Sequence, residues 1–285
     1  MTEILVVANE TLGGRRLREV LAQKAKSNPS LLVRLVIPQS RPRRGSVVYL
    51  DSVRDVANVR LELALAVLRD DGFEVTGEVG DFDPFHATMD AIGEHRPDEI
   101  VISTFPAVAS GWLRRDLVER VADASGIPVQ HVISEFGDDE DDPPNDTTLV
   151  VATRTAASPE LIGRLSEIAA QDTAGAGGGH LFIIVVPAPG AGGGAAVEAR
   201  AHLDAALARL HDAGLYVAGM VGDPDPFTAT MNALQFFRIS RVVISTLPET
   251  KSGWMRADLI ERVRRYAACP IEHVVATTSD AVAAN

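Results

Sequence analysis

Two stretches of this chain repeat one another and decide its fold. Residues 72–132 read GFEVTGEVGDFDPFHATMDAIGEHRPDEIVISTFPAVASGWLRRDLVERVADASGIPVQHV, and residues 214–274 read GLYVAGMVGDPDPFTATMNALQFFRISRVVISTLPETKSGWMRADLIERVRRYAACPIEHV. They align without a gap at a constant offset of 142 residues (214 − 72), and about half of the positions are identical. A duplication this long predicts two domains of one kind. A motif present in both copies then belongs to the shared unit.

The length of 285 residues agrees with about two domains of ordinary size. We predict a first domain over residues 1–136 and a second over residues 147–285. Residues 137–146 (GDDEDDPPND) lie between them. A run of like charges repels itself and does not pack, which is typical of a solvated linker; an acidic segment that binds a metal or a partner is the alternative.

Short apolar runs alternate with helical patterns in each copy. Such runs are typical of strands buried on both faces of a parallel sheet. The first copy is expected to have strands at residues 4–8, 31–37, 73–79, 99–103 and 129–133, with helices between them that include residues 84–94 and 112–124. The second copy repeats this order, beginning with strands at 149–152 and 181–186 and a long helix at 197–210. Five strands alternating with four helices predict an α/β fold: two tandem flavodoxin-like or Rossmann-like, doubly wound five-stranded parallel sheets.

The composition excludes several classes of protein. A hydrophobic fraction of 46% against 23% charged residues is that of a soluble chain with a real core. The formal net charge of −12 argues against nucleic acid or an anionic membrane as a partner. The single cysteine, Cys269, excludes an intramolecular disulfide and a CxxC metal site. Neither a signal-peptide pattern nor an apolar run of membrane-spanning length is found, so a cytoplasmic location is expected.

Candidate binding residues follow the strands. In an open doubly wound sheet, ligands bind beyond the carboxyl ends of the strands, where the strand order reverses. Hydroxyl and amide side chains stand there, and a Ser-Gly-Trp-x-Arg segment follows in both copies, whose serine could cap the next helix and whose arginine could meet an anion. The predicted ligand-binding residues are Asn9, Ser103, Thr104, Ser110, Trp112 and Arg114, with their counterparts Thr153, Ser245, Thr246, Ser252, Trp254 and Arg256. The alternative is that the tryptophans only pack the loop and that each arginine pairs with a nearby acid.

The motif Gly-Asp-x-Asp-Pro-Phe-x-Ala-Thr-Met also occurs twice, from Gly80 and from Gly222. Its second aspartate followed by proline predicts a helix N-cap with proline in the first turn. The first aspartate, Asp81 or Asp223, could instead accept a hydrogen bond from a ligand.

Other signals are weaker. A GxGxxG/A pattern at residues 190–195 has no counterpart in the first copy, so it does not predict a dinucleotide site. His131 and His273 have no metal-ligating partner at a suitable spacing and are interpreted as structural. We find no catalytic constellation and predict no catalytic residue and no metal site.

The order of elements and three local motifs resemble the universal stress protein family. The motifs are Gly-Asp-x-x-Pro after strand three, Val-Ile-Ser-Thr in strand four, and Glu-Arg-Val followed by Cys-Pro-Ile before strand five, the last seen in full in the second copy. Because the similarity covers both halves, the chain resembles a tandem universal stress protein. The resemblance implies an internal pseudo-dimer of two flavodoxin-like domains.

The sequence departs from the ATP-binding members of that family at the same places in both copies. Those members carry an acidic residue after strand one, two glycines after strand four, and a Gly-Ser or Gly-Thr pair before the next helix. Here these positions hold Asn9 and Thr153, then Ser103 with Pro106 and Ser245 with Pro248, and finally Arg115-Asp116 and Ala257-Asp258. An aspartate repels a phosphate, and proline offers no amide donor. The triphosphate mode is therefore expected to be lost.

The function expected from these observations is non-catalytic binding of a small-molecule ligand or a protein partner, related to stress, without a cofactor. The alternative is a protein that binds ATP or AMP in an altered site, or a weak nucleotide hydrolase that uses Asp81 or Asp116. A purely structural interaction module is a third reading, and a further homodimer stays open.

Overall fold

The computed structural model describes residues 2–11, 14–40, 50–105, 116–134, 147–172, 179–190, 193–248 and 258–277. Within it the chain divides into two compact units, each built on one five-stranded sheet. The acidic segment predicted to be a linker lies outside the described residues. The domain limits at residues 136 and 147 stay a prediction.

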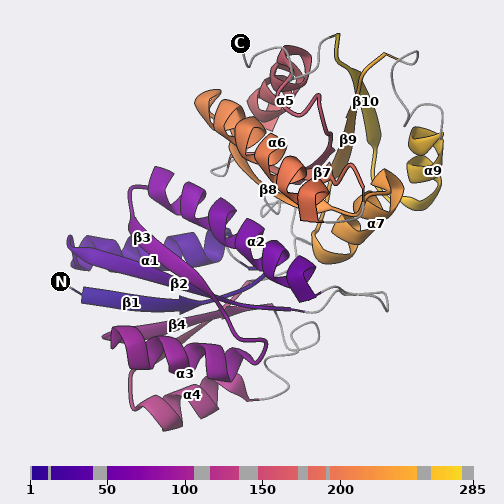
Figure 1. Cartoon of the computed structure of the whole chain (residues 1–285). Helices are drawn as coiled ribbons and strands as arrows, with labels where there is room; N and C mark the ends of the chain where they lie inside the picture. Colours follow the sequence, from indigo (N-terminus) through magenta and orange to yellow (C-terminus); the bar gives the residue numbers. More distant parts are fainter. Residues whose placement is uncertain are drawn as a thin grey trace. The chain divides into compact units, whose positions relative to one another are not determined.

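The first domain alternates strands and helices throughout. Its elements are β1 (Thr2–Val7), α1 (Arg15–Ser27), β2 (Leu31–Pro38), α2 (Leu50–Asp70), β3 (Glu74–Gly80), α3 (Pro84–His95), β4 (Glu99–Thr104), α4 (Leu117–Ser125) and β5 (Val129–Ile133). All strand pairs are parallel, in the order β3-β2-β1-β4-β5. Helices α1 and α2 cover one face and α3 and α4 the other (Figure 1). The predicted doubly wound α/β fold is confirmed, with the Rossmann strand order.

The second domain repeats this arrangement. Its elements are β6 (Thr147–Val151), α5 (Pro159–Asp172), β7 (Leu181–Pro187), α6 (Gly193–Asp212), β8 (Tyr216–Gly222), α7 (Pro226–Phe236), β9 (Arg241–Thr246), α9 (Leu259–Tyr266) and β10 (Ile271–Val275). The order β10-β9-β6-β7-β8 is the same topology seen from the opposite edge, and the pairs are again parallel. The duplication in the sequence is therefore a duplication of the whole fold.

The apolar strands are buried because helices cover both faces of each sheet. In the first domain Ile4 and Val6 pack with Leu17 of α1 on one face, whereas Leu5 and Val7 pack on the other face, toward α3 and α4. Successive side chains of a strand point to opposite faces. A strand covered on both sides must consequently be apolar at every position, as the pattern predicted.

The helix predicted from Trp112 begins later. Residues 112–115 lie outside the described part, and α4 starts at Leu117 because Asp116 has φ 49°, in the left-handed region. Asp258 precedes α9 with φ 48° in the same way. A non-glycine residue in this region interrupts a right-handed helix, so the predicted helix start was wrong in the first copy.

The repeated Gly-Asp-x-Asp-Pro-Phe motif shapes the junction between strand three and the following helix. Asp83 Oδ1 accepts the amide hydrogen of Phe85 at 2.8 Å, which confirms the predicted N-cap of α3. Asp81 Oδ1 accepts the amide of Asp83 at 2.8 Å. In the second copy Asp223 Oδ1 likewise accepts the amide of Asp225 at 2.8 Å, and Asp225 Oδ2 caps α7 by accepting the amide of Thr228 at 3.1 Å. The first aspartate thus organises its own turn in both domains.

The phenylalanine of the same motif also contacts an arginine of a neighbouring helix in each domain. The guanidinium carbon of Arg120 on α4 lies 4.2 Å from the ring centroid of Phe85 on α3. In the second domain Arg262 on α9 lies 4.2 Å from the ring centroid of Phe227 on α7. A cation over an aromatic face is attractive at this distance. The repeated Asp-Pro-Phe and Glu-Arg-Val motifs therefore serve the packing of the fold.

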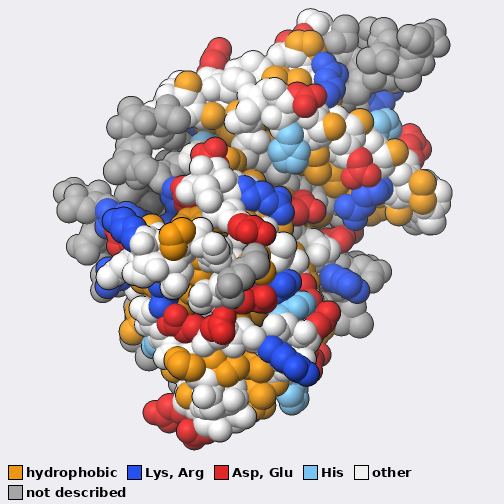
Figure 2. Space-filling model, turned by 90° about the vertical axis from the view of Figure 1, so that its left-hand side faces the viewer, with side chains coloured by type: hydrophobic (Ala, Val, Ile, Leu, Met, Phe, Trp, Pro, Cys, Tyr) orange, Lys and Arg blue, Asp and Glu red, His pale blue; other side chains and the backbone are white. Residues whose placement is uncertain are grey.

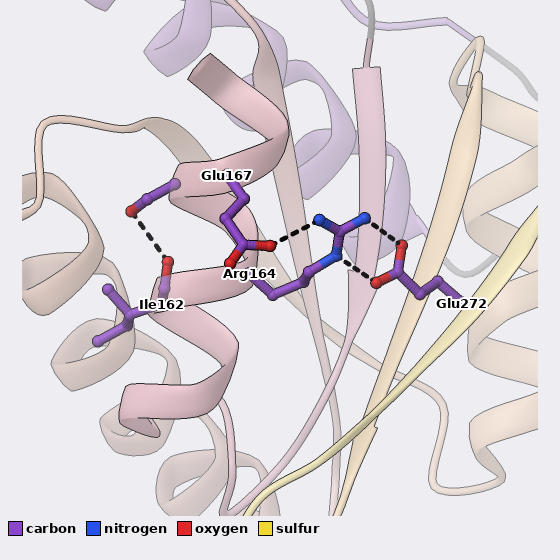
Figure 3. A network of polar contacts seen from close by, with 5 residues as sticks. Ile162, Arg164, Glu167 and Glu272 are labelled. Atoms are coloured by element: carbon purple, nitrogen blue, oxygen red, sulfur yellow. Dashed lines mark hydrogen bonds and ion pairs between the residues drawn. The ribbon is translucent and has the colours of Figure 1, made fainter. Parts of the chain in front are cut away.

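A further polar contact fixes the edge of the second sheet. Arg164 on α5 reaches Glu272 on β10 with two of its nitrogens, and its third nitrogen donates to Glu167 at 2.8 Å (Figure 3). The hydrogen bond to Glu272 is the main cause that raises the pKa of Arg164 above its ordinary value. A bidentate pair of this kind is oriented as well as attractive, so it ties α5 to the edge strand.

Candidate functional site

The candidate site lies where the strand order reverses. In the first domain this point is between β1 and β4, and in the second between β6 and β9. The chain leaving the first strand of each domain meets the end of the fourth strand there. The predicted residues Asn9, Ser103 and Thr104, with Thr153, Ser245 and Thr246, lie at these strand ends.

A threonine hydroxyl bridges the reversal point in both domains. Thr11 Oγ1 donates to the backbone oxygen of Ser103 at 3.1 Å, and Thr155 Oγ1 donates to the backbone oxygen of Ser245 at 3.0 Å. Both threonines are buried. The prediction missed them, although the sequence held a signal: ANET and ATRT follow the first strand of each copy and share this threonine. In each domain this hydrogen bond joins the segment after the first strand to the end of the fourth strand.

The two hydroxyl residues that end β4 do not act together. Because neighbouring residues of a strand face opposite ways, Ser103 and Thr104 point to different sides of the sheet. Ser103 Oγ lies 3.5 Å from Ser134 Oγ, whereas Thr104 Oγ1 contacts His131. Their side chains are 1% and 3% exposed. These two predicted residues are therefore neighbours in the sequence, but their side chains do not lie on the same face of the sheet.

The second domain has the same division with one difference. Ser245 and Thr246 are 1% and 3% exposed, and Thr246 Oγ1 contacts His273. Ala276 stands where the first domain has Ser134. As a result, Ser245 Oγ is buried without a hydrogen-bond partner among the described residues.

A threonine–histidine pair recurs at the end of the sheet in both domains. Thr104 Oγ1 lies 2.9 Å from His131 Nε2, and Thr246 Oγ1 lies 2.8 Å from His273 Nε2. Each pair joins the fourth strand to the fifth. Burial lowers the pKa of His131, and burial, followed by the charge of Arg264, lowers the pKa of His273. Each histidine was interpreted from the sequence as structural, and each has a hydrogen-bond partner in the fourth strand of its domain.

These pKa shifts predict a loss of stability on mild acidification. Well above the ordinary histidine pKa of 6.5 both rings are neutral in either state and the stability contribution is constant. As the pH falls through that value, the unfolded chain binds protons first, so the free energy of unfolding falls until the pH passes the lowered folded pKa. We expect the denaturant midpoint to drop between about pH 7 and pH 5.5, above the range where most carboxyls titrate.

The control for this pH effect is the double variant His131→Gln/His273→Gln, whose amides can still hydrogen bond to the two threonines. Its midpoint should change less over the same pH range than that of the unaltered protein. Equal slopes for the two proteins would show that other groups cause the pH dependence.

Asn9 belongs to a polar cluster around a buried arginine. Its amide nitrogen donates to the backbone oxygen of Pro38 at 3.2 Å, and its amide oxygen accepts from Arg60 at 2.7 Å. Arg60 also donates to Ser40 Oγ at 3.0 Å and lies 4.0 Å from Glu10. Arg60 is 9% exposed. This arginine of α2 thereby joins the carboxyl ends of β1 and β2.

The second domain lacks that arginine. At the positions of Asn9 and Arg60 it has Thr153 and His202. The arginine cluster is consequently a feature of the first domain alone, and it was missed from the sequence because Arg60 lies inside a long helical pattern rather than in a strand-end motif.

Six of the predicted binding residues lie outside the described part of the chain: Ser110, Trp112, Arg114, Ser252, Trp254 and Arg256. The described neighbours Asp116 and Asp258 are exposed, and neither side chain caps its helix. The role of the six predicted residues in binding stays a prediction.

The Thr–His pairs are the nearest approach to a catalytic arrangement in these two strand-end regions. A nucleophile needs a base that is oriented by a third group and must be reached by its substrate. Neither histidine contacts a carboxylate within the described residues, and both threonine hydroxyls are buried. This geometry holds strands together and does not present a nucleophile.

The next feature is the distribution of charged side chains on the described surface. On the face shown in Figure 2, acidic and basic side chains are interspersed, without a continuous basic stripe. In the part of the chain that the structure describes, no helix has both the length and the apolar character to cross a bilayer.

Fold and site together define a tandem α/β protein with two Rossmann-ordered domains and buried strand-end hydroxyls. No protein-family model matches the chain, and no curated protein matches it. Solved structures that match include three universal stress proteins. One from Archaeoglobus fulgidus has a TM-score of 0.33 and 14% identity over 97% of each chain. One from Arabidopsis thaliana with AMP bound has a TM-score of 0.35 and 16% identity, covering 50% of this chain and 98% of its own. One from Pseudomonas aeruginosa has a TM-score of 0.30 and 14% identity over 99% and 95% of the two chains.

Proposed function

We propose that this chain is a non-catalytic, universal-stress-like tandem protein that acts by binding a protein partner or a small ligand, with the triphosphate site lost in both domains. The observation that carries the proposal is the burial of all four hydroxyl side chains at the ends of β4 and β9: Ser103, Thr104, Ser245 and Thr246. Three of them have partners inside the domain. A ligand at the surface cannot reach them without rearrangement.

The charge at the following helix supports the same conclusion. A helix N-terminus attracts phosphate through its free amides and its dipole. Here an exposed aspartate stands at that position of α4 and of α9, namely Asp116 and Asp258. A phosphate bound there would meet a like charge, which lowers its affinity.

The sheet edges support a protein partner. Strands β5 and β10 end the strand orders of the two sheets. At equivalent positions of these strands, Ile133 and Val275 are 47% and 45% exposed. An edge strand with an exposed aliphatic side chain is a template for pairing with another chain segment. The internal pseudo-dimer that the sequence implies remains part of this proposal.

The test is native mass spectrometry of the purified full chain, with small-molecule extraction from the same sample. We expect no co-purifying nucleotide, and no change in melting temperature when ATP, AMP or a cyclic nucleotide is added. Ser103→Ala is expected to change stability only. A stoichiometric nucleotide whose affinity falls in Thr104→Val would overturn the proposal, provided that the variant keeps its melting temperature.

A weak nucleotide hydrolase is the second candidate. One observation favours it: Asp116 and Asp258 adopt the left-handed conformation at matching positions, and backbone strain of this kind is concentrated at functional sites. This candidate requires ATP turnover that disappears in Asp116→Ala and persists in Asp70→Ala, an exposed aspartate at the end of α2. Absence of turnover in the unaltered protein removes it.

A further inference from the structure

A histidine and two glutamates meet on the first domain, outside the candidate site described above. Glu78 lies on the edge strand β3, and Glu94 and His95 end helix α3. One ligand atom from each of the three side chains lies within 4.8 Å of the others. An imidazole nitrogen and two carboxylates form a common set of metal ligands in proteins.

The spacing within this cluster matches two ligands of one ion. His95 Nε2 lies 3.4 Å from Glu78 Oε1. Two ligand atoms that each bind a tetrahedral zinc ion at about 2.1 Å are separated by about 3.4 Å. Nε2 is itself buried and makes no hydrogen bond within the described residues. A buried ring nitrogen that makes no hydrogen bond is costly, and a bound cation would give it a ligand bond.

The second domain shows that the fold does not require these polar residues. Met220, Phe236 and Phe237 stand at the positions of Glu78, Glu94 and His95. They are 5%, 5% and 8% exposed, so the same junction of strand three and its helix can be filled with apolar side chains. The need to pack β3 against α3 therefore does not explain two carboxylates and a histidine in the first domain.

We propose that Glu78, Glu94 and His95 bind a divalent transition-metal ion, with Zn²⁺ as the best fit. The histidine nitrogen disfavours Ca²⁺ and Mg²⁺, which prefer oxygen ligands. Three protein ligands leave the fourth position of a tetrahedral ion to water. The Glu78 side chain is 40% exposed and Glu94 is exposed, so the ion can enter from solvent. When bound, it would join the edge strand to the end of α3.

The experiment is a calorimetric titration of the untagged, metal-stripped full chain with Zn²⁺. We expect one Zn²⁺ per chain and an increase in melting temperature, because an ion that binds only the folded state stabilises it. His95→Phe places the second domain's residue at this position and should weaken binding by at least about tenfold.

The matched control is His86→Thr. His86 is an exposed histidine of the same helix, and threonine is its counterpart in the second domain, so this variant should bind Zn²⁺ as the unaltered protein does. Glu78→Met, also a second-domain residue, tests the site independently if His95→Phe folds poorly. The visible spectrum of the Co²⁺ form should show four-coordinate binding, and this spectrum should be lost in both site variants.

Two results would overturn the proposal. One is the absence of saturable Zn²⁺ binding below millimolar concentration in the unaltered protein. The other is unchanged affinity in Glu78→Met and His95→Phe, which would place the ion elsewhere on the chain. Neither result bears on the nucleotide tests above, since those concern the strand ends.

Discussion

Replacing Gly80 by alanine is expected to destabilise the first domain by roughly 1–3 kcal/mol, the usual cost of an extra methyl group in a packed core. A Cβ atom at this position would lie 2.6 Å from Ala87 Cβ and 3.2 Å from Val36 Cγ1. Ala87 belongs to α3, whose backbone cannot move away alone. The helix and the strand must separate to make room. Denaturant unfolding, followed in the transition assigned to the first domain, measures the change.

Gly93→Ala is the matched control, because it makes the same change within helix α3, the helix against which Gly80 of β3 packs. A Cβ atom at Gly93 would have no neighbour within 4 Å. Alanine in a helix is favoured over glycine by about 0.5–1 kcal/mol, so this variant should stabilise the domain. The two substitutions should thus have opposite signs. If Gly80→Ala were as stable as the unaltered protein, this result would contradict the close packing of α3 on β3 at Gly80.

Arg60→Met is expected to cost roughly 2–4 kcal/mol, since it removes the charged centre of a buried polar cluster. Methionine fills a similar volume but donates no hydrogen bond. Asn9 Oδ1 would lose its donor at 2.7 Å, Ser40 Oγ would lose its donor at 3.0 Å, and the contact of Arg60 with Glu10 at 4.0 Å would be lost. The midpoint of denaturant unfolding and the amide exchange of residues 8–10 should both report the loss.

Arg69→Met tests whether the effect belongs to this position. Arg69 is an exposed arginine of the same helix, and such surface substitutions are usually within about 0.5 kcal/mol of neutral. Equal effects of the two substitutions would contradict a structural role for the Arg60 cluster. The second domain, which has His202 at the corresponding position, should be unaffected by either change.

The architecture was predictable because its signals are local and occur twice. Continuous apolar runs such as Ile4–Val7 indicate strands covered on both faces, and their alternation with helical patterns leaves a parallel sheet as the consistent solution. The Asp83-Pro84 pair predicted the start of α3 from capping chemistry alone. The start of α4 was not predictable in this way, because Asp116 interrupts the helical pattern through its backbone conformation, to which side-chain periodicity is insensitive.

By itself, the sequence determined that this protein has two domains of one α/β kind, and which residues end their strands. Only the tertiary structure decided what those residues contact. Ser103 and Thr104 are neighbours in the chain, yet the pleat of β4 sends their hydroxyls to opposite faces, toward Ser134 and His131. The buried Arg60 reaches Asn9 from another element, and Glu78 meets His95 across the junction of β3 and α3. Periodicity reports the face of an element on which a residue lies. Which side chains meet depends on how strands and helices pack, and this is set by contacts between residues far apart in the chain.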